Sequence, residues 1–147
     1  MISFRLPDDE EMTLPVSHTE IEKNSATCTV VKDAGDDPDV THGASIVVTV
    51  SFSNHPDIRF LQGEGVGRVT LPGLGLEIGE PAINRIPRQM IMKELSALYD
   101  KGLDITISVP GGKELAQRTF NPKLGIVDGI SIIGTSGIVR PFSSEAF

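Results

Sequence analysis

Tryptophan is absent from this 147-residue sequence, and tyrosine and cysteine each occur once. So few large aromatic rings argue against a surface on which the bases of a single-stranded nucleic acid stack. The single cysteine, Cys28, excludes an intrachain disulfide and an all-cysteine metal cluster. It lies in the segment TCTVV, where a small buried hydrophobe is expected rather than a reactive thiol.

Positive charge is also scarce, because 20 acidic residues outnumber 13 basic ones and the net charge is −7. Nucleic-acid-binding modules carry a basic surface, so no nucleic-acid partner is expected. No stretch approaches the ~20 consecutive apolar residues of a membrane-spanning helix, and the N-terminus lacks a signal-peptide pattern. These features predict a cytoplasmic protein without a membrane partner.

Strand signals dominate the first third of the chain. Alternating apolar residues predict a strand over 2–6, and further strands are expected over 12–16 and 26–31. The strongest strand signal is the β-branched run ASIVVTVSF at 44–52. Together these strands predict an antiparallel meander.

One convincing helix signal begins at Pro87, since proline is favoured in the first turn. Ile91, Leu95 and Leu98 follow at the i, i+4, i+7 spacing of one helix face, and Gly102 is the expected C-cap. These residues predict a helix that packs an apolar stripe against the strands.

Further strands are expected over 103–109 and 129–133, with a short helical turn over 113–118 between them. Strands, one helix and returning strands predict an α+β fold. We expect a mixed, mostly antiparallel sheet with one principal helix packed on a face, as a two-layer sandwich. A chain of this length buries roughly two-thirds of its unfolded surface, so residues 1–147 are expected to form a single domain.

The loop DAGDDPDVTHG at 33–43 gathers four aspartates before a strand. Carboxylates suit a hard cation, but the calcium-loop spacing is missing and His42 has no second histidine beside it. Aspartate also favours turns, because its side chain bonds nearby backbone N–H groups. We therefore predict a structured loop and no metal site.

Two glycine-containing segments allow more than one interpretation. GEGVGRVT at 63–70 lacks the helix that a dinucleotide-binding fingerprint requires. It is either a backbone that approaches a ligand, with Arg68 supplying charge, or a bulged hairpin with a solvated arginine. In GEPAIN at 79–84, Glu80 and Asn84 are either a catalytic acid–amide pair or ordinary turn residues.

The stretch TFNPKLGIVDGISIIGTSGIVRP at 119–141 places four glycines among short apolar runs. Glycine at this density weakens a strand unless the backbone turns tightly or approaches something closely. The pattern favours a binding edge over plain core. The three histidines of the chain are scattered, and no Ser-His-Asp or Cys-His pattern supports covalent nucleophilic catalysis.

Long ordered blocks, among them DAGDDPDVT and TFNPKLGIVDGISI, give the chain a close resemblance to one family. It resembles the cobalt-precorrin-5B C1-methyltransferases (CbiD) of anaerobic cobalamin biosynthesis over nearly its whole length. The resemblance implies an S-adenosylmethionine-dependent enzyme that transfers a methyl group to C1 of a corrinoid substrate, whose cobalt arrives with it. Family members are longer, so the chain is expected to be a fragment that lacks an N-terminal segment and the C-terminal half.

This resemblance directs attention to cations beside the glycine motifs, because a corrin ring carries many carboxylates that arginine binds bidentately. The predicted substrate-binding residues are Arg68, Arg118, Lys123 and Arg140, although each is equally interpretable as a solvated surface charge. For the methyl donor, the turn Gly134, Thr135, Ser136 and Gly137 after a strand is the best local candidate. The catalytic residue is not identified.

Two alternatives belong to other classes of protein. The fragment is either part of the enzyme site or a non-catalytic scaffold for the missing half, which is also its expected partner. An acidic cation-binding domain is a third hypothesis, based on the loop at 33–43 only. Self-association into a homo-oligomer is left open.

Overall fold

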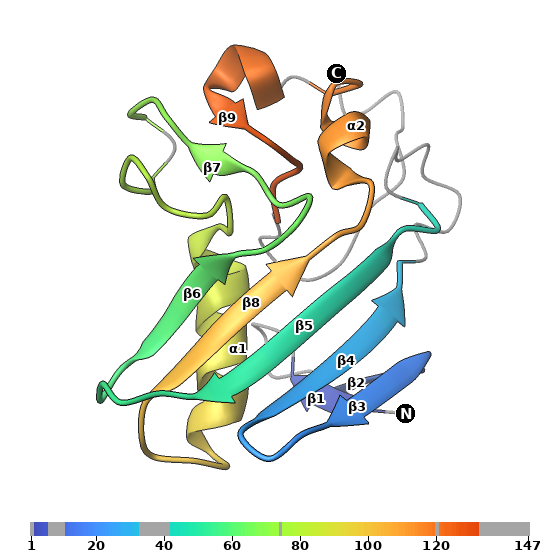
Figure 1. The fold of residues 1–147 in the computed structure, drawn as a ribbon, viewed down its shortest axis with the longest axis vertical. Helices are drawn as coiled ribbons and strands as arrows, with labels where there is room; N and C mark the ends of the chain where they lie inside the picture. The colour runs from blue at the N-terminus through green and yellow to red at the C-terminus, as the bar shows by residue number, and fades with distance from the viewer. Residues whose placement is uncertain (1, 6–10, 33–41, 74, 120, 133–147) are drawn as a thin grey trace.

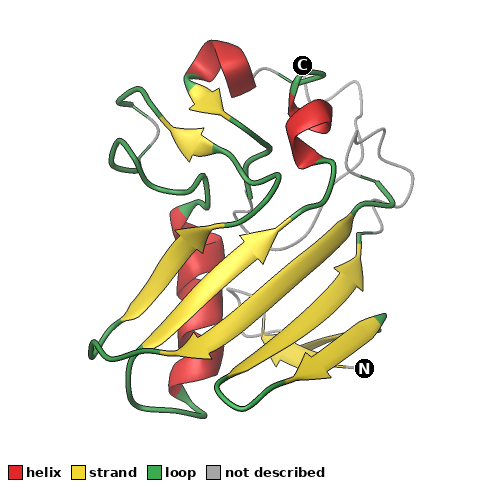
Figure 2. Cartoon of the chain, viewed as in Figure 1, coloured by secondary structure: helices red, strands yellow, loops and turns green. Residues whose placement is uncertain are grey.

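The computed structural model describes residues 2–5, 11–32, 42–73, 75–119 and 121–132 (Figure 2). Its elements, in chain order, are β1 (Ile2–Arg5), β2 (Glu11–Leu14), β3 (His18–Ile21), β4 (Ser25–Val31), β5 (Ser45–Phe52), β6 (Ile58–Gln62), β7 (Arg68–Val69), α1 (Arg85–Ser96), β8 (Leu103–Ser108), α2 (Gly112–Ala116), the 3-10 helix η1 (Asn121–Leu124) and β9 (Ile126–Val127). Among these residues, no helix is both long enough and apolar enough to cross a membrane.

A five-stranded sheet in the order β3-β4-β5-β8-β6 forms the main layer. All neighbours are antiparallel except β6 and β8, which run parallel. Helix α1 lies across one face of this sheet (Figure 1). The predicted α+β class, with a mixed, mostly antiparallel sheet and one principal helix on a face, is confirmed.

The meander is shorter than predicted. It consists of β3, β4 and β5, whereas β1 and β2 pair only with each other, as a separate hairpin. The sequence signals also missed β3 and β6, the two edge strands of the main sheet. Both are largely exposed, so neither shows the buried apolar run or clean alternation by which an interior strand is recognised.

The sheet has two chemically different faces, as strand β8 shows. Leu103, Ile105 and Ile107 are buried beneath the helix, while the intervening polar residues of LDITIS are half-exposed on the other face. Neighbouring strands continue this pattern: on the polar face, the hydroxyls of Thr27 and Thr49 hydrogen-bond across β4 and β5 at 2.9 Å. Alternation in the sequence therefore sets which face receives the helix.

Helix α1 follows the extended N-cap residue Asn84 and carries Pro87 in its first turn. Ile91 and Leu95 pack against the core, as the predicted stripe requires. The predicted end of the helix is wrong, because the C-cap is Ala97. Leu98 consequently lies beyond the helix and is 84% exposed.

Gly102 serves a different purpose from the predicted cap. A Cβ atom at this position would overlap the backbone carbonyl of His55 in the neighbouring loop. The glycine therefore allows two loops to touch where β8 begins, and only the fold brings these loops together.

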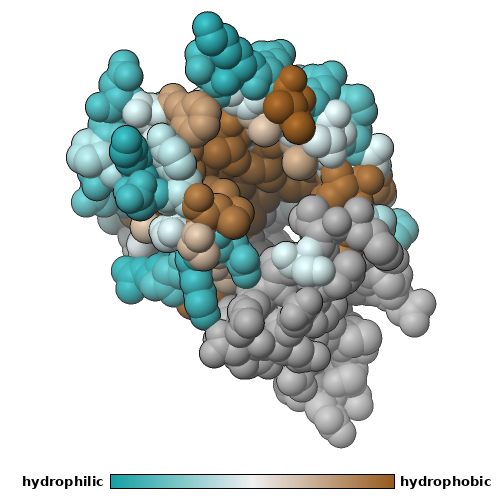
Figure 3. All heavy atoms as spheres, turned by 90° about the horizontal axis from the view of Figure 1, so that it is seen from below, coloured by the Kyte–Doolittle hydropathy of each residue, from teal (hydrophilic) through white to brown (hydrophobic). Residues whose placement is uncertain are grey.

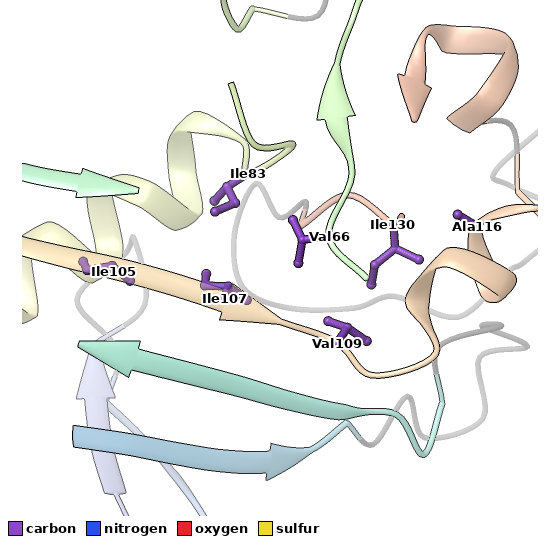
Figure 4. Close-up of a cluster of buried hydrophobic side chains, with 7 residues drawn as sticks. All are labelled: Val66, Ile83, Ile105, Ile107, Val109, Ala116 and Ile130. Atoms are coloured by element: carbon purple, nitrogen blue, oxygen red, sulfur yellow. The ribbon is translucent and has the colours of Figure 1, made fainter. Parts of the chain in front are cut away.

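The principal core contains seven buried residues, drawn in Figure 4: Val66, Ile83, Ile105, Ile107, Val109, Ala116 and Ile130. They come from β8, from α2 and from the loops around β7 and β9. A strand predicted over 129–133 is not formed within the described residues. Instead, Ile130 makes a single bridge to Val66, and Ile132 makes one to Ile83.

Packing between helix and sheet is incomplete along β5. A hollow of about 330 Å³ lies there, lined mainly by aliphatic side chains of α1 and β5: Val48, Val50, Pro87, Met90, Ile91, Glu94 and Leu95. Figure 3, which views the molecule from below, shows hydrophobic side chains gathered on that face.

Candidate functional site

The candidate site lies beyond the carboxyl ends of the parallel strands β6 and β8, where β7, β9, η1 and α2 are grouped (Figure 1). Ligands of sheets with parallel strands commonly bind at this edge, because the loops that follow the strands converge there. Here the converging loops are the glycine-rich segments after β6 and β8, together with the segment after β9.

These loops contact one another through their backbones. A Cβ atom on Gly65 would overlap the carbonyl of Val109, and one on Gly112 or Gly129 would overlap the carbonyl of Gly65. Gly65 also accepts a hydrogen bond from the N–H of Ile130 at 2.9 Å. We call this contact of three loops, at Gly65, Gly112 and Gly129, the glycine junction.

The glycine junction shows which group the glycines at 63–70 approach within the chain. Its glycines do allow a close approach, but the approaching group is the protein backbone. Each of the three glycines is buried. Arg68 lies in β7, where it pairs with Val127, and its side chain is half-buried.

Three of the four predicted substrate-binding cations lie on this group of elements. Arg68 is in β7, Arg118 is exposed directly after α2, and Lys123 is exposed in η1. Arg140 and the predicted donor turn at Gly134, Thr135, Ser136 and Gly137 lie outside the described residues. The loop at 33–41 lies outside them as well.

A hollow of about 220 Å³ opens between α2 and η1–β9. Its lining combines apolar and polar side chains with one residue of the glycine junction, Gly129. The lining residues are Lys113, Ala116, Gln117, Pro122, Ile126, Val127, Asp128 and Gly129. Arg118 and Lys123 each directly follow a lining residue. Sequence reasoning overlooked Lys113 and Asp128, although Asp128 precedes a glycine in an Asp-Gly turn signal.

Glu80 is explained by a structural contact. Its carboxylate accepts hydrogen bonds from Arg88 at 3.2 Å and from the N–H of Glu77 at 3.1 Å. Arg88 also donates to the carbonyls of Ile83 and Pro81, and its guanidinium lies 5.2 Å from the ring centre of Phe60. These contacts favour the turn interpretation of Glu80.

A charged cluster lies at the opposite end of β6 and β8. The Asp104 carboxylate is 2.8 Å from Nε2 of His55 and 3.3 Å from Nε of Arg59. The hydrogen bond with His55 holds the pKa of Asp104 below its ordinary value of 3.8, and the charge of Arg59 lowers it further against the opposing effect of burial. Nδ1 of His55 is buried without a hydrogen-bond partner and Nε2 is engaged by Asp104, so this imidazole is poorly placed to bind a substrate.

Among the described residues, no group of three or more His, Cys, Asp or Glu side chains is arranged to hold a metal ion. What the described site offers is a rigid backbone junction, a small hollow and several cations around it. These features suit the binding and orientation of an anionic small molecule.

The fold and site thus define an α+β domain whose glycine-rich loops meet beyond the carboxyl ends of two parallel strands. Comparison with known proteins identifies the family. The CbiD family model matches residues 1–141. The chain belongs to the CbiD family.

Curated relatives named cobalt-precorrin-5B C(1)-methyltransferase are similar over nearly the whole chain. The protein of Leptospira borgpetersenii is 50% identical over 99% of this chain, and that of Rubrobacter xylanophilus is 51% identical over 100% of it. This chain spans 41% and 39% of those two proteins.

A solved structure, the cobalamin biosynthesis protein CbiD from Archaeoglobus fulgidus, matches with a TM-score of 0.65 and 30% identity. The match covers 99% of this chain and 47% of that one. The fold described above is therefore found in a crystal structure of the family.

Proposed function

We propose that this chain takes part in methyl transfer to C1 of cobalt-precorrin-5B, in cobalamin biosynthesis, with S-adenosylmethionine as the donor. The observation that carries the proposal is the family match over residues 1–141, supported by relatives about half identical that bear this name. Because the chain spans about two-fifths of those relatives, the activity is proposed for the polypeptide of which it forms the corresponding part.

The chemistry of this reaction agrees with the groups at the site. The C1 carbon supplies the electron pair of the new C–C bond, while the S–CH₃ bond breaks and its pair stays on sulfur. Such an in-line displacement depends on positioning and electrostatics rather than on a protein nucleophile. A rigid junction flanked by cations is suited to that work.

We further propose that Arg68, Arg118, Lys123 and Arg140 bind carboxylates of the corrinoid, and that Gly134, Thr135, Ser136 and Gly137 contact the donor. The first three cations are supported by their place on neighbouring elements at one end of the sheet. The donor turn is supported by the sequence pattern alone, and Gly134→Val is expected to weaken binding of S-adenosylhomocysteine in calorimetry.

Binding of a corrinoid tests the substrate part of the proposal. Cobyrinic acid, a cobalt corrinoid with free carboxylates, is titrated into the chain and into Arg68→Gln. Loss of one charge-assisted contact is expected to weaken binding about tenfold. Arg85→Gln, which removes an exposed arginine from α1, is the matched control and is expected to bind like the wild type.

Calorimetry also separates this proposal from the alternative of a non-catalytic scaffold. The scaffold alternative is supported by the observation that the chain spans only about two-fifths of the curated relatives. A chain that binds neither cobyrinic acid nor S-adenosylhomocysteine supports the scaffold and contradicts a direct part in the site.

A further inference from the structure

The hollow between α2 and β9 is too small for a whole ligand. Its volume is about 220 Å³, whereas sites that enclose a drug-sized molecule measure about 300–1,000 Å³. Its inner wall is aliphatic, with Ala116, Ile126 and Val127. It therefore suits one end of a molecule that has a short apolar chain.

The mouth of the hollow carries one positive and one negative side chain. Nζ of Lys113 lies 4.0 Å from Oδ1 of Asp128, and both side chains are more than half exposed. Hydrogen bonds to charged groups are about 2.7–2.9 Å long, so the two groups form a long, exposed ion pair and are not hydrogen-bonded to each other. Each is placed to bond a third group that lies between or beside them.

Asp128 occupies an unusual backbone position. Among the described residues it is the one non-glycine with a positive φ, at 70°. Aspartate tolerates this conformation better than most residues, yet glycine adopts it without strain. A carboxylate at this position is thus held at some conformational cost, and such outliers suggest a function.

The backbone that directly follows Asp128 is held by several contacts. Asn121, a buried polar residue, donates from Nδ2 to the carbonyl of Gly129 at 3.3 Å. Gly129 packs against Gly65 in the glycine junction, and Ile130 is hydrogen-bonded to the same loop. The carboxylate of Asp128 therefore extends from a pre-organised segment rather than from a free loop.

We propose that this hollow is a subsite for a zwitterionic α-amino-acid group. In this arrangement Asp128 accepts hydrogen bonds from the ammonium, Lys113 donates to the carboxylate, and the aliphatic wall contacts the side-chain methylenes. The amino-acid end of the methyl donor has this chemistry, and in that form the inference rests on the proposed function. A free amino acid has the same chemistry.

Calorimetric titrations of the 147-residue chain with three ligands distinguish the methyl donor from a free amino acid as the molecule that this subsite binds. S-adenosylhomocysteine carries both the nucleoside and the amino-acid end, 5′-methylthioadenosine carries the nucleoside without that end, and methionine is the free amino acid. The variants are Asp128→Asn, which keeps a residue suited to positive φ, and Lys113→Gln. Asp57→Asn and Lys101→Gln, two exposed residues at the other end of the sheet, are the matched controls.

We expect Asp128→Asn to weaken S-adenosylhomocysteine binding at least tenfold, and Lys113→Gln to weaken it several-fold. Binding of 5′-methylthioadenosine is expected to be the same in all proteins, and the thermal midpoints of the variants are expected to match the wild type. The two control variants are expected to bind every ligand as the wild type does.

Other outcomes overturn the subsite or its assigned ligand. Equal binding of S-adenosylhomocysteine to wild type and Asp128→Asn removes the subsite but leaves the proposed function standing. Binding of methionine but not S-adenosylhomocysteine, lost in Asp128→Asn, keeps the subsite and contradicts the donor of the proposed function. A wild type that binds neither ligand overturns the subsite as well as the donor assignment.

Discussion

The two ends of the parallel strands β6 and β8 differ in how far they depend on backbone contact and on charged side chains. At the carboxyl ends, three loops meet backbone against backbone at Gly65, Gly112 and Gly129. At the amino ends, one glycine, Gly102, packs against the carbonyl of His55, and a cluster of His55, Arg59 and Asp104 adds contacts between charged side chains. Close backbone contact leaves no room for a larger side chain, whereas partly exposed charged groups rearrange or bind water. We therefore expect the glycine junction to be intolerant of substitution and the charged cluster to be tolerant.

Gly65→Ala is expected to have the largest effect. The residue has a φ of +75°, and its new Cβ would overlap the carbonyl of Val109. Left-handed strain and overpacking together are expected to lower the free energy of unfolding by about 3 kcal/mol or more. Urea denaturation followed by circular dichroism measures this loss.

Gly111→Ala is the matched control, because Gly111 has a φ of +79° and nothing within 4 Å of a new Cβ. It is expected to cost about 1 kcal/mol, from backbone strain alone. Equal losses for the two variants would show that close contact at the glycine junction is unimportant.

Arg88→Ala tests how the loop at 79–84 is held on α1, and a smaller loss is expected. The Arg88 side chain is 17% exposed and donates to Glu80, Pro81 and Ile83. Loss of these bonds removes three charge-assisted contacts from a largely buried side chain, at a cost on the order of 2 kcal/mol. Arg88→Lys keeps the charge but not the planar fork, so it is expected to restore only part of the stability.

Arg85→Ala, at an exposed position of the same helix, is expected to change stability by less than about 0.5 kcal/mol. If Arg88→Lys is as stable as the wild type, then charge alone holds the loop and the forked geometry is unnecessary.

Asp104→Asn is expected to have the smallest effect and a distinct pH dependence. Since its pKa is lowered in the folded protein, the folded state binds fewer protons than the unfolded one as pH falls through the carboxylate range. The stability that Asp104 contributes is therefore present above its ordinary pKa of 3.8 and is lost as pH falls through the lower folded-state value.

At pH 7 we expect Asp104→Asn to cost about 1 kcal/mol, because the site is partly exposed to solvent. As pH falls below the ordinary value of 3.8 and through the lowered pKa of the folded state, the difference from wild type is expected to shrink progressively. The control is Asp57→Asn, at an exposed position in the adjoining loop. A loss that stays constant from pH 7 to pH 3 would mean that the ionised carboxylate is not the stabilising species.

Local patterns predicted the parts of the fold that depend on local physics. The alternation of LDITIS predicted the buried and half-exposed residues of β8, and the spacing of Ile91 and Leu95 predicted the face of α1 that packs. The edge strand β6 was not predicted, because its residues are largely exposed and because its partner β8 lies far from it along the chain. Pairing at that separation has no signal within a short window of sequence.

The candidate site was predictable in a more limited way. The sequence pattern indicates Arg68, Arg118 and Lys123 as cations near glycines, and they lie on neighbouring elements, but their roles stay predictions. The pattern does not indicate Asp128 as a site residue, because its significance lies in a positive φ and in its approach to Lys113 across the hollow. A contact such as that between His55 and Asp104, 49 residues apart in the chain, leaves no trace in local spacing.

The sequence by itself determined the fold class, the apolar faces of its central elements and, through long ordered blocks, the family. These depend on periodicity and residue order, which a linear pattern contains in full. Only the tertiary structure decided what the glycines are for: those at 65, 112 and 129 make room for other loops of the same chain. A glycine in the sequence indicates that another group lies close to its backbone. Contacts between distant segments of the chain determine which group that is.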